Sequence, residues 1–338
     1  ASTITWLIHQ KFELSIPLYR QEKEWEALGL RLSRATMSNW LLVVYRDWLV
    51  HIVHRLKLEL LKQRYLHIDE THVQVLKEPG RKNTSDSYMW VYCSIRDAVN
   101  PIRYFEYQPG RSGKYPEAFL REYEGYIHTD AYSGYNAVSG VKRCLCYTHL
   151  RRAFVDALPK DIHNSEASKP AEAILRLNQL FNLESELEAL PPDQKKKERL
   201  IREKPLLEAF WSWAEKSAIG ELPKSKLSKA FHYALNNREG FWNYLEDGNC
   251  SISNSLAENC IRPFVIGRKN WLFSGSPKGA EASAGIYTLV ETAKANGLAP
   301  MKYIKYILSD MPGSAFLEHP EYLDDYLPWN PLVKEFCR

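Results

Sequence analysis

Residues 65–76 read YLHIDETHVQVL, and at this stretch the chain changes from a helical to a strand-like pattern. The residues that share the parity of Asp69 after it are β-branched, as is typical of one face of a strand. Two further runs rich in aromatic and β-branched residues, 88–95 and 102–107, predict an antiparallel pair. The sequence therefore predicts a sheet whose first strand carries Asp69.

The order of the elements that follow indicates a particular kind of sheet. A short helix at 116–123 precedes a strand at 126–129, and after a brief helix or turn a further strand follows at 142–147. The resulting order, β-β-β-α-β-α-β, is that of a ribonuclease-H-like fold. In that fold the first and fourth strands are neighbours, so we expect Asp69 and Asp130 to lie close together.

The rest of the chain divides around this core. The pattern between residues 148 and 245 is helical throughout, and the lysine run at 195–197 is interpreted as a solvated helix face rather than a DNA contact. We predict an α/β protein with a ribonuclease-H-like mixed-sheet catalytic core, an all-helical insertion and a helical, helix-turn-helix-like N-terminal region. The expected segments are the N-terminal region 1–62, the first part of the core 63–150, the insertion 151–248, the second part of the core 249–310 and the C-terminal tail 311–338.

The N-terminal region contains the stretch GLRLSRATMSNW at 29–40. A Gly turn, a Ser at a helix N-cap position and a short polar helix with an apolar end resemble a helix-turn-helix. Arg34, Ser38 and Asn39 would then face DNA. An ordinary helical hairpin fits the same residues equally well.

Three acidic residues occupy distinct settings along the chain. Asp69 and Asp130 lie at or near the ends of strand-like runs, and Glu258 opens a helix-like run rich in Arg and Lys. Carboxylates that converge from distant segments suit a pair of Mg²⁺ ions, which prefer hard oxygen ligands. The pattern therefore predicts an enzyme that cuts nucleic acid. Glu70 is a rival ligand, although neighbours on a strand point to opposite faces and only one of the two should reach the metals.

Composition limits the number of domains and the cellular compartment that we expect. The chain has 338 residues, a net charge of +4 and six scattered cysteines, which fits two or three domains in a reducing compartment. It contains no run of 18 apolar residues and no signal-peptide pattern, so we expect a soluble cytoplasmic protein without a membrane partner. Because the chain starts with Ala1 inside a helix-like run, we expect a processed, trimmed or partial product.

Several motifs together resemble the transposases of the bacterial insertion-sequence-66 family. The similarity runs from Pro17 to Asn330, which is nearly the whole chain. Its sharpest parts are HIDET at 67–71, DAYSGY at 130–135, CYTHLRR at 146–152, AENCIRP at 257–263 and GRKNWLF at 267–273.

The resemblance implies a DDE-type transposase whose acidic triad is Asp69, Asp130 and Glu258. Asp69 would bridge two Mg²⁺ or Mn²⁺ ions, and each of the other two acids would complete the coordination of one ion. The implied chemistry is cleavage at the transposon ends followed by strand transfer into target DNA. The implied partners are double-stranded DNA, at least one further copy of the chain on that DNA, and accessory proteins from the same element. Family members usually carry additional N-terminal sequence, including a Cys-rich zinc module.

The resemblance also assigns roles around the triad. A Cys-x-x-His signature follows the second Asp in several transposase families, so His149 is expected near the active site. A zinc half-site made of Cys146 and His149 is the alternative. Expected DNA-backbone contacts are Arg151, Arg152, Arg262, Arg268, Lys269 and Lys278.

Two neighbouring features have open interpretations. Trp271 would either stack on a base or belong to the core. The loop SGSPKG at 274–279, which contains Lys278, would either hold a backbone phosphate at a helix N-terminus or form a plain turn.

Two other classes of function fit the same residues. One is a structure-specific nuclease on the ribonuclease-H-like fold, which cuts DNA without joining it. The other is a catalytically decayed protein that only binds DNA, although the survival of all three acids with their motifs argues against decay.

Overall fold

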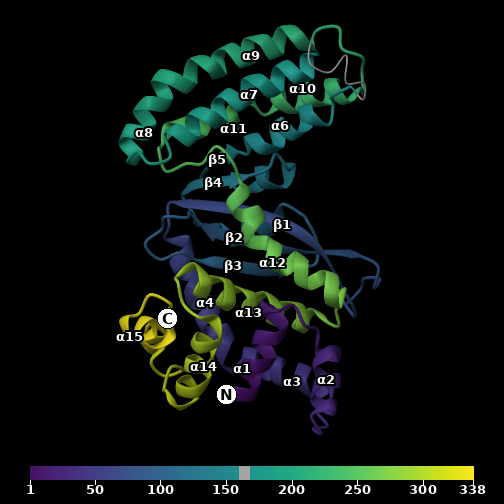
Figure 1. Ribbon diagram of the computed structural model, residues 1–338, viewed down its shortest axis with the longest axis vertical. Helices are drawn as coiled ribbons and strands as arrows, with labels where there is room; N and C mark the ends of the chain where they lie inside the picture. The colour runs from purple at the N-terminus through teal and green to yellow at the C-terminus, as the bar shows by residue number, and fades with distance from the viewer. Residues whose placement is uncertain (160–167) are drawn as a thin grey trace. The chain divides into compact units, whose positions relative to one another are not determined.

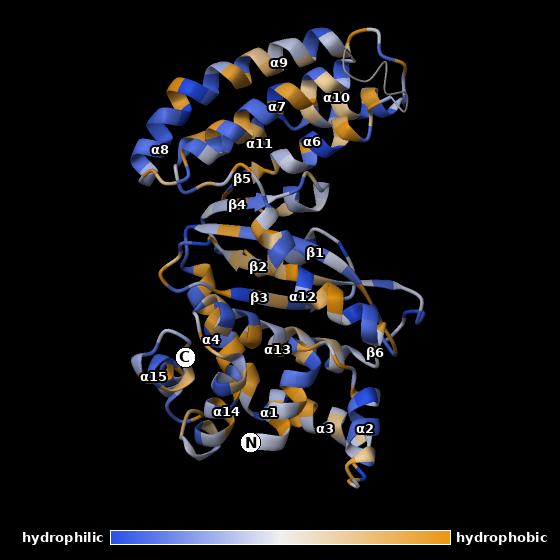
Figure 2. Ribbon diagram, viewed as in Figure 1, coloured by the Kyte–Doolittle hydropathy of each residue, from blue (hydrophilic) through white to orange (hydrophobic). Residues whose placement is uncertain are grey.

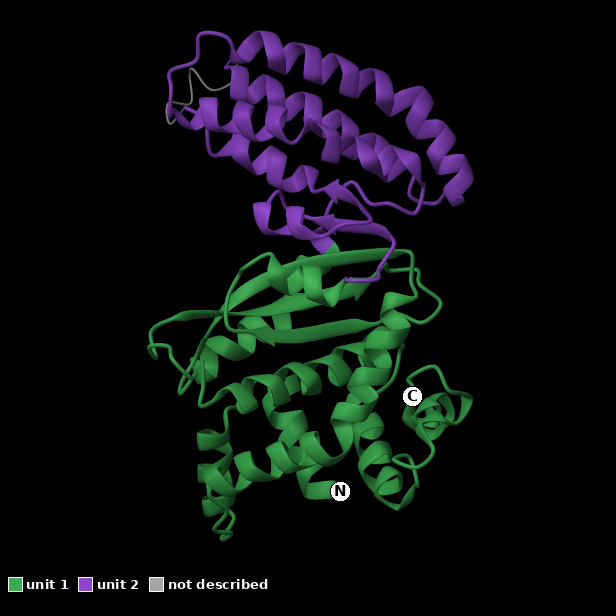
Figure 3. Cartoon of the chain, turned by 180° about the vertical axis from the view of Figure 1, so that it is seen from behind, with its two compact units in different colours: residues 1–120, 256–338 green, residues 121–255 purple. Residues whose placement is uncertain are grey.

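The computed structural model describes residues 1–159 and 168–338 as two compact units. Residues 1–120 and 256–338 form the first unit, and residues 121–255 form the second (Figure 3). The chain is a mixed α/β protein, because antiparallel strand pairs, parallel strand pairs and many helices all occur in it. None of the described helices is long and apolar enough to cross a membrane.

The first unit is built on three antiparallel strands in the order β3-β2-β1. They are β1 (Tyr65–Val75), β2 (Asp86–Ser94) and β3 (Arg103–Gln108), within a few residues of the predicted runs. The short strand β6 (Phe273–Ser274) pairs in parallel with the end of β1. Asp69 lies in the middle of β1, opposite Val91 of β2.

Helices surround these strands in the first unit. They are α1 (Ser2–Ile8), α2 (Leu18–Ala27), α3 (Arg34–Val44), α4 (Val50–Leu61), α5 (Lys114–Phe119), α12 (Ser255–Trp271), α13 (Pro277–Ala295), α14 (Pro300–Asp310) and α15 (Pro331–Cys337). A π-helical segment, Tyr45–Leu49, joins α3 to α4 into one nearly continuous rod.

Helix α13 closes the outer edge of β3, beside which it lies in Figure 1. The hydroxyl of Thr288 accepts a hydrogen bond from the Phe105 N–H at 2.8 Å, and that of Thr292 accepts one from the Arg103 N–H at 3.0 Å. These donors belong to an edge strand and would otherwise be open to pairing with another chain. Elsewhere α13 packs closely against the segment that joins α3 to α4, because a Cβ on Gly285 would meet the ring of Tyr45 at 2.1 Å.

The second unit joins a parallel strand pair to a set of helices. The strands are β4 (Gly125–Thr129) and β5 (Val141–Leu145), with His128 opposite Cys144. The helices are α6 (Tyr147–Val155), α7 (Lys169–Glu186), α8 (Pro192–Glu198), α9 (Lys204–Ala218), α10 (Lys226–Asn236) and α11 (Arg238–Trp242). Hydrophobic and hydrophilic residues alternate along α7 and α9 (Figure 2), and buried aromatic side chains such as Phe154, Phe210 and Phe231 fill the space between the helices.

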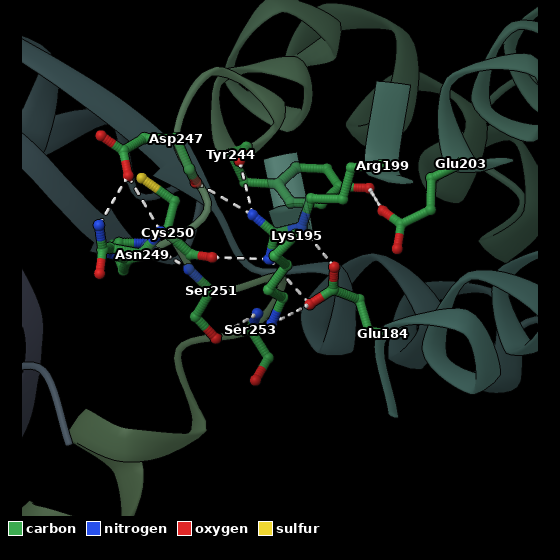
Figure 4. Close-up of polar contacts among 11 residues, drawn as sticks. Glu184, Lys195, Arg199, Glu203, Tyr244, Asp247, Asn249, Cys250, Ser251 and Ser253 are labelled. Atoms are coloured by element: carbon green, nitrogen blue, oxygen red, sulfur yellow. Dashed lines mark hydrogen bonds and ion pairs between the residues drawn. The ribbon is translucent and has the colours of Figure 1, made fainter. Parts of the chain in front are cut away.

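The second unit contains a fully buried arginine, Arg199, with several polar partners (Figure 4). Arg199 binds the carboxylate of Glu184 through Nε at 2.5 Å and through one terminal nitrogen at 2.8 Å. The remaining donors reach three backbone carbonyls, those of Tyr244, Asp247 and Cys250, at 2.8–3.0 Å. All five N–H groups of the guanidinium therefore have acceptors.

The lysines that precede Arg199, at 195–197, are predicted to form a solvated helix face, and two of the three do. Lys196 and Lys197 are exposed, but Arg199 is buried and Lys195 lies 3.2 Å from Glu184. The run therefore has a solvated face and an inner face.

A second glutamate adjoins the Arg199–Glu184 pair. Glu203 is buried, and its Oε2 accepts a hydrogen bond from the Tyr244 hydroxyl at 2.7 Å. Burial, and then the negative charge of Glu184, raise the pKa of Glu203 to about 8. Burial also opposes ionisation of Glu184, but its bonds to Arg199 outweigh that effect and lower the pKa of Glu184. At neutral pH, Glu184 is therefore ionised and Glu203 is protonated.

Neutralising Glu184 should destabilise the folded protein, whereas neutralising Glu203 should stabilise it at alkaline pH. Glu184→Gln leaves the buried Arg199 charge without its partner and should lower the free energy of unfolding by about 3–5 kcal/mol. In the folded protein the pKa of Glu203 is above its unfolded value, so the folded state loses stability as pH rises from about 4.5 to about 8. Glu203→Gln removes this loss. It should match the parent at acidic pH and be the more stable protein at about pH 8. Thermal unfolding across this pH range measures both effects, and a Glu203→Gln protein that is destabilised most at alkaline pH would contradict the assignment.

Candidate active site

Asp69 is half-buried on β1, and its Oδ1 accepts a hydrogen bond from the Glu70 N–H at 2.9 Å. The adjacent carboxylate of Glu70 is held in another way. Its side chain is 2% exposed and binds Arg111 through two guanidinium nitrogens, at 2.5 and 2.6 Å. The rival ligand thus forms an ion pair, a role that no pattern in the sequence indicated.

Glu258 lies in the first turn of α12, a helix with one buried stripe, of which Phe264 packs edge-on against Tyr287 of α13. The stripe consists of Ala257, Ile261, Phe264 and Gly267. Near its start, Cys260 of α12 forms a thiol hydrogen bond with Cys93 of β2. Near its end, Arg268 donates to the hydroxyl of Thr71 at 3.0 Å and to the carbonyl of His72, both on β1. The helix is therefore fastened to β1 and β2 at two points.

The thiol of Cys93 connects Asp69 with α12. Burial, the hydrogen bond with Cys260 and the negative charge of Asp69 all raise the pKa of Cys93. Cys93 thus lies close enough to Asp69 to sense its charge and close enough to Cys260 to bond with it. The strand of Asp69 and the helix of Glu258 therefore meet in the first unit, as a site built from these two acids requires.

Asp130 follows β4 in the second unit and is half-buried. Its Oδ1 accepts a hydrogen bond from the Tyr132 N–H at 3.0 Å, which makes a local turn. Arg143 on β5 donates to the Asp130 carbonyl at 2.6 Å and to the Thr129 hydroxyl at 2.7 Å. Arg143 was not among the predicted residues. The only sequence signal was its position on the strand that follows Asp130.

His149 and Cys146 belong to the same turn at the start of α6. The Cys146 Sγ accepts a hydrogen bond from the Asn254 N–H at 3.1 Å. Burial opposes ionisation of this thiol, but its hydrogen bonds with the His149 side chain and the Asn254 backbone outweigh burial and lower its pKa. The Cys-x-x-His motif therefore forms a thiol–imidazole pair within the second unit.

The predicted DNA-reading residues lie on an exposed surface of α3. Ser33 caps the helix by accepting the Thr36 N–H at 3.1 Å, as its position in the sequence indicated. Arg34, Ser38 and Asn39 are exposed, whereas Met37 is buried. One face of α3 thus packs on the first unit and the other carries the three polar side chains to solvent.

The other predicted basic contacts divide into two groups. Arg152, Arg262, Lys269 and Lys278 are exposed. Arg151 is half-buried and donates to Asn178 of α7 at 2.8 Å, and half-buried Arg268 holds β1 as described above. These two arginines have structural partners, which the motif pattern did not reveal.

Trp271 packs against neighbouring residues, and the loop after it caps a helix. The Trp271 ring lies 6.4 Å from that of Tyr287 and packs against Gly267, where a Cβ would come within 2.1 Å of it. These contacts favour the core interpretation of Trp271. In the loop 274–279, Ser276 caps α13 by accepting the Gly279 N–H at 3.2 Å, so this helix end already has a side-chain cap.

Comparison with known proteins identifies relatives of this chain. The model of the Transposase IS66 family matches residues 1–282. The uncharacterized protein y4qI of Sinorhizobium fredii is 28% identical over 350 residues, covering 97% of this chain and 62% of that protein. The uncharacterized proteins y4hP and y4jD of the same organism are 26% and 25% identical, covering 96% of this chain and 60% and 64% of their own lengths. The chain thus spans less than two thirds of the length of these curated relatives. No solved structure matches it.

The two-point attachment of α12 can be tested at Arg268. Arg268→Met removes the hydrogen bonds to Thr71 and His72 and should lower the free energy of unfolding by about 1–2 kcal/mol. Hydrogen exchange in residues 255–275 should accelerate. Arg262→Met is the matched control, because Arg262 is an exposed residue of the same helix and its loss should change stability by less than about 0.5 kcal/mol. Equal effects of the two changes would show that Arg268 does not fasten the helix.

Proposed function

Because the chain belongs to the Transposase IS66 family, we propose that it is a DDE-type transposase that cuts DNA at transposon ends and joins the ends to target DNA. Asp69, Asp130 and Glu258 are the proposed catalytic acids, on a core of the ribonuclease-H-like kind. The single observation that carries the proposal is the attachment of α12 to β1 and β2, because it brings the helix of Glu258 to the strand of Asp69.

The donor set fits divalent magnesium or manganese. All three acids are half-buried residues, and one carboxylate oxygen of Glu258, Oε1, is shielded from solvent. Carboxylate oxygens are the hard ligands that Mg²⁺ and Mn²⁺ prefer. When bound, two such ions would activate the attacking oxygen and neutralise the charge on the leaving oxygen.

The remaining chain supplies positioning for this chemistry. Arg111 holds the Glu70 carboxylate away from a ligand role, and Arg143 fixes the backbone of Asp130. The exposed residues Arg152, Arg262, Lys269 and Lys278 offer positive charge to DNA phosphates, which gives affinity but little sequence choice. His149, paired with Cys146, would orient the scissile phosphate or support Asp130. Paired cutting of two ends favours at least two copies of the chain on DNA.

Neutralising each acid tests the catalytic assignment. Asp69→Asn, Asp130→Asn and Glu258→Gln should each reduce Mg²⁺-dependent cleavage by at least about 100-fold while DNA binding persists, because each removes one charged metal ligand. The substrate is a duplex that carries the inverted repeats flanking the gene. Glu70→Gln is the matched control on β1. It should retain cleavage and lose stability, because Arg111 loses its partner.

Two further readouts separate the competing functions. Crystals soaked in Mn²⁺ should show anomalous density at the three carboxylates, and a labelled end should become covalently joined to a target plasmid. Cleavage without joining would instead identify a structure-specific nuclease. DNA binding without metal density or cleavage would identify a decayed protein, and full cleavage by Asp69→Asn would reject the site.

We propose that α3 contributes to DNA binding through its exposed face. Arg34→Ala should weaken binding and reduce the slope of log affinity against log salt by about one unit, because one phosphate contact is lost. Asn39→Ala should weaken binding to the terminal repeat more than to random DNA. Lys196→Ala is the matched control, because Lys196 is also exposed but lies on α8 of the second unit. Fluorescence anisotropy at several salt concentrations measures all three, and an unchanged slope for Arg34→Ala would assign α2 and α3 to an ordinary hairpin.

A further inference from the structure

Three buried side chains of the second unit form a cluster apart from the acids discussed above. They are His128 on β4, Cys144 on β5 and Cys250 in the segment after α11. One ligand atom of each lies within 4.8 Å of the other two. His128 and Cys144 are register partners on parallel strands, so their side chains leave the same face of the pair.

From this cluster we propose that His128, Cys144 and Cys250 form a structural binding site for a zinc ion. Two thiolates and one imidazole are soft to intermediate ligands, which favour Zn²⁺ over Mg²⁺. Bond lengths of about 2.3 Å for Zn–S and about 2.0 Å for Zn–N place tetrahedral ligand atoms about 3.5–3.8 Å apart. The observed cluster is compatible with that size after small side-chain movements. Three protein ligands leave the fourth position for water.

The imidazole is already in a suitable tautomer. The Ser251 N–H donates to His128 Nε2 at 2.9 Å, so this nitrogen carries a lone pair and the proton is assigned to Nδ1. Zinc binding at Nε2 would exchange the Ser251 N–H for the ion. The Cys250 thiol forms hydrogen bonds with both Cys144 and His128, so the three side chains already contact one another.

The backbone holds Cys250 in place. Its carbonyl accepts a hydrogen bond from Arg199 at 2.8 Å, and its N–H donates to the Asp247 carbonyl at 3.0 Å. A zinc ion would thus attach a segment already fixed to the helices of the second unit to the strands β4 and β5. Its function would be to stabilise this unit, independently of the proposed catalysis.

Metal analysis of the purified full chain tests the site. After removal of metal by a chelator and dialysis against Zn²⁺, the chain should bind one tightly held zinc ion and show a higher unfolding temperature. Co²⁺ should give the thiolate-to-cobalt charge-transfer band in the near ultraviolet. Cys144→Ser and Cys250→Ser should lose both the ion and the band. His149→Ala and Cys337→Ser should keep both, because their side chains lie outside the cluster.

A histidine variant tests the proposal even if a cysteine variant folds poorly. His128→Asn keeps both thiols and should weaken zinc binding by at least about 10-fold, with an unchanged circular dichroism spectrum. A parent chain that takes up no zinc would overturn the proposal. So would loss of the ion in His149→Ala with retention in Cys250→Ser, which would assign the ion to the Cys-x-x-His pair. A Cys144–Cys250 disulfide in freshly purified protein without metal would replace the zinc site with a redox pair. None of these readouts involves DNA, so they stand whatever the outcome for the proposed transposase.

Discussion

Helix α12 is held on its sheet by a guanidinium at one end and a thiol pair at the other, and the proposed chemistry of the first unit depends on this attachment. A glutamate on a helix can serve beside an aspartate on a strand only if the helix cannot slide or rotate. The buried stripe of α12 prevents rotation, while Arg268 fixes its position along β1. The contacts that support the proposed function therefore come mainly from residues that would not themselves react.

The sequence predicted those parts of the molecule that depend on local patterns. The strands β1, β2 and β3 were found within a few residues because their alternation and β-branched content act over short distances. Ser33 was recognised as a helix cap for the same reason: its bond to Thr36 spans three residues. The three acids were selected by their motifs, and their catalytic roles stay predictions.

What the sequence could not show depends on long-range pairing. Arg111 meets Glu70 across 41 residues, and Arg268 meets Thr71 across 197, so no short window contains both partners. Arg199 directly follows a charged run in which nothing indicates burial, yet its acceptors include carbonyls 45 to 51 residues away. His128, Cys144 and Cys250 were likewise too far apart in the chain to be read as one cluster.

Because all five N–H groups of Arg199 are used, the helical segment that carries it is tied to the segment after α11. The helical segment cannot be deleted and its flanking ends rejoined without loss to the strands. Excision between α6 and the segment after α11 would remove Arg199, which donates to the carbonyls of Tyr244, Asp247 and Cys250 in that segment. A shortened descendant would need a new donor for the buried Cys250 carbonyl before it could fold around β4 and β5. The helices are therefore as much a part of the strand-bearing unit as the strands themselves.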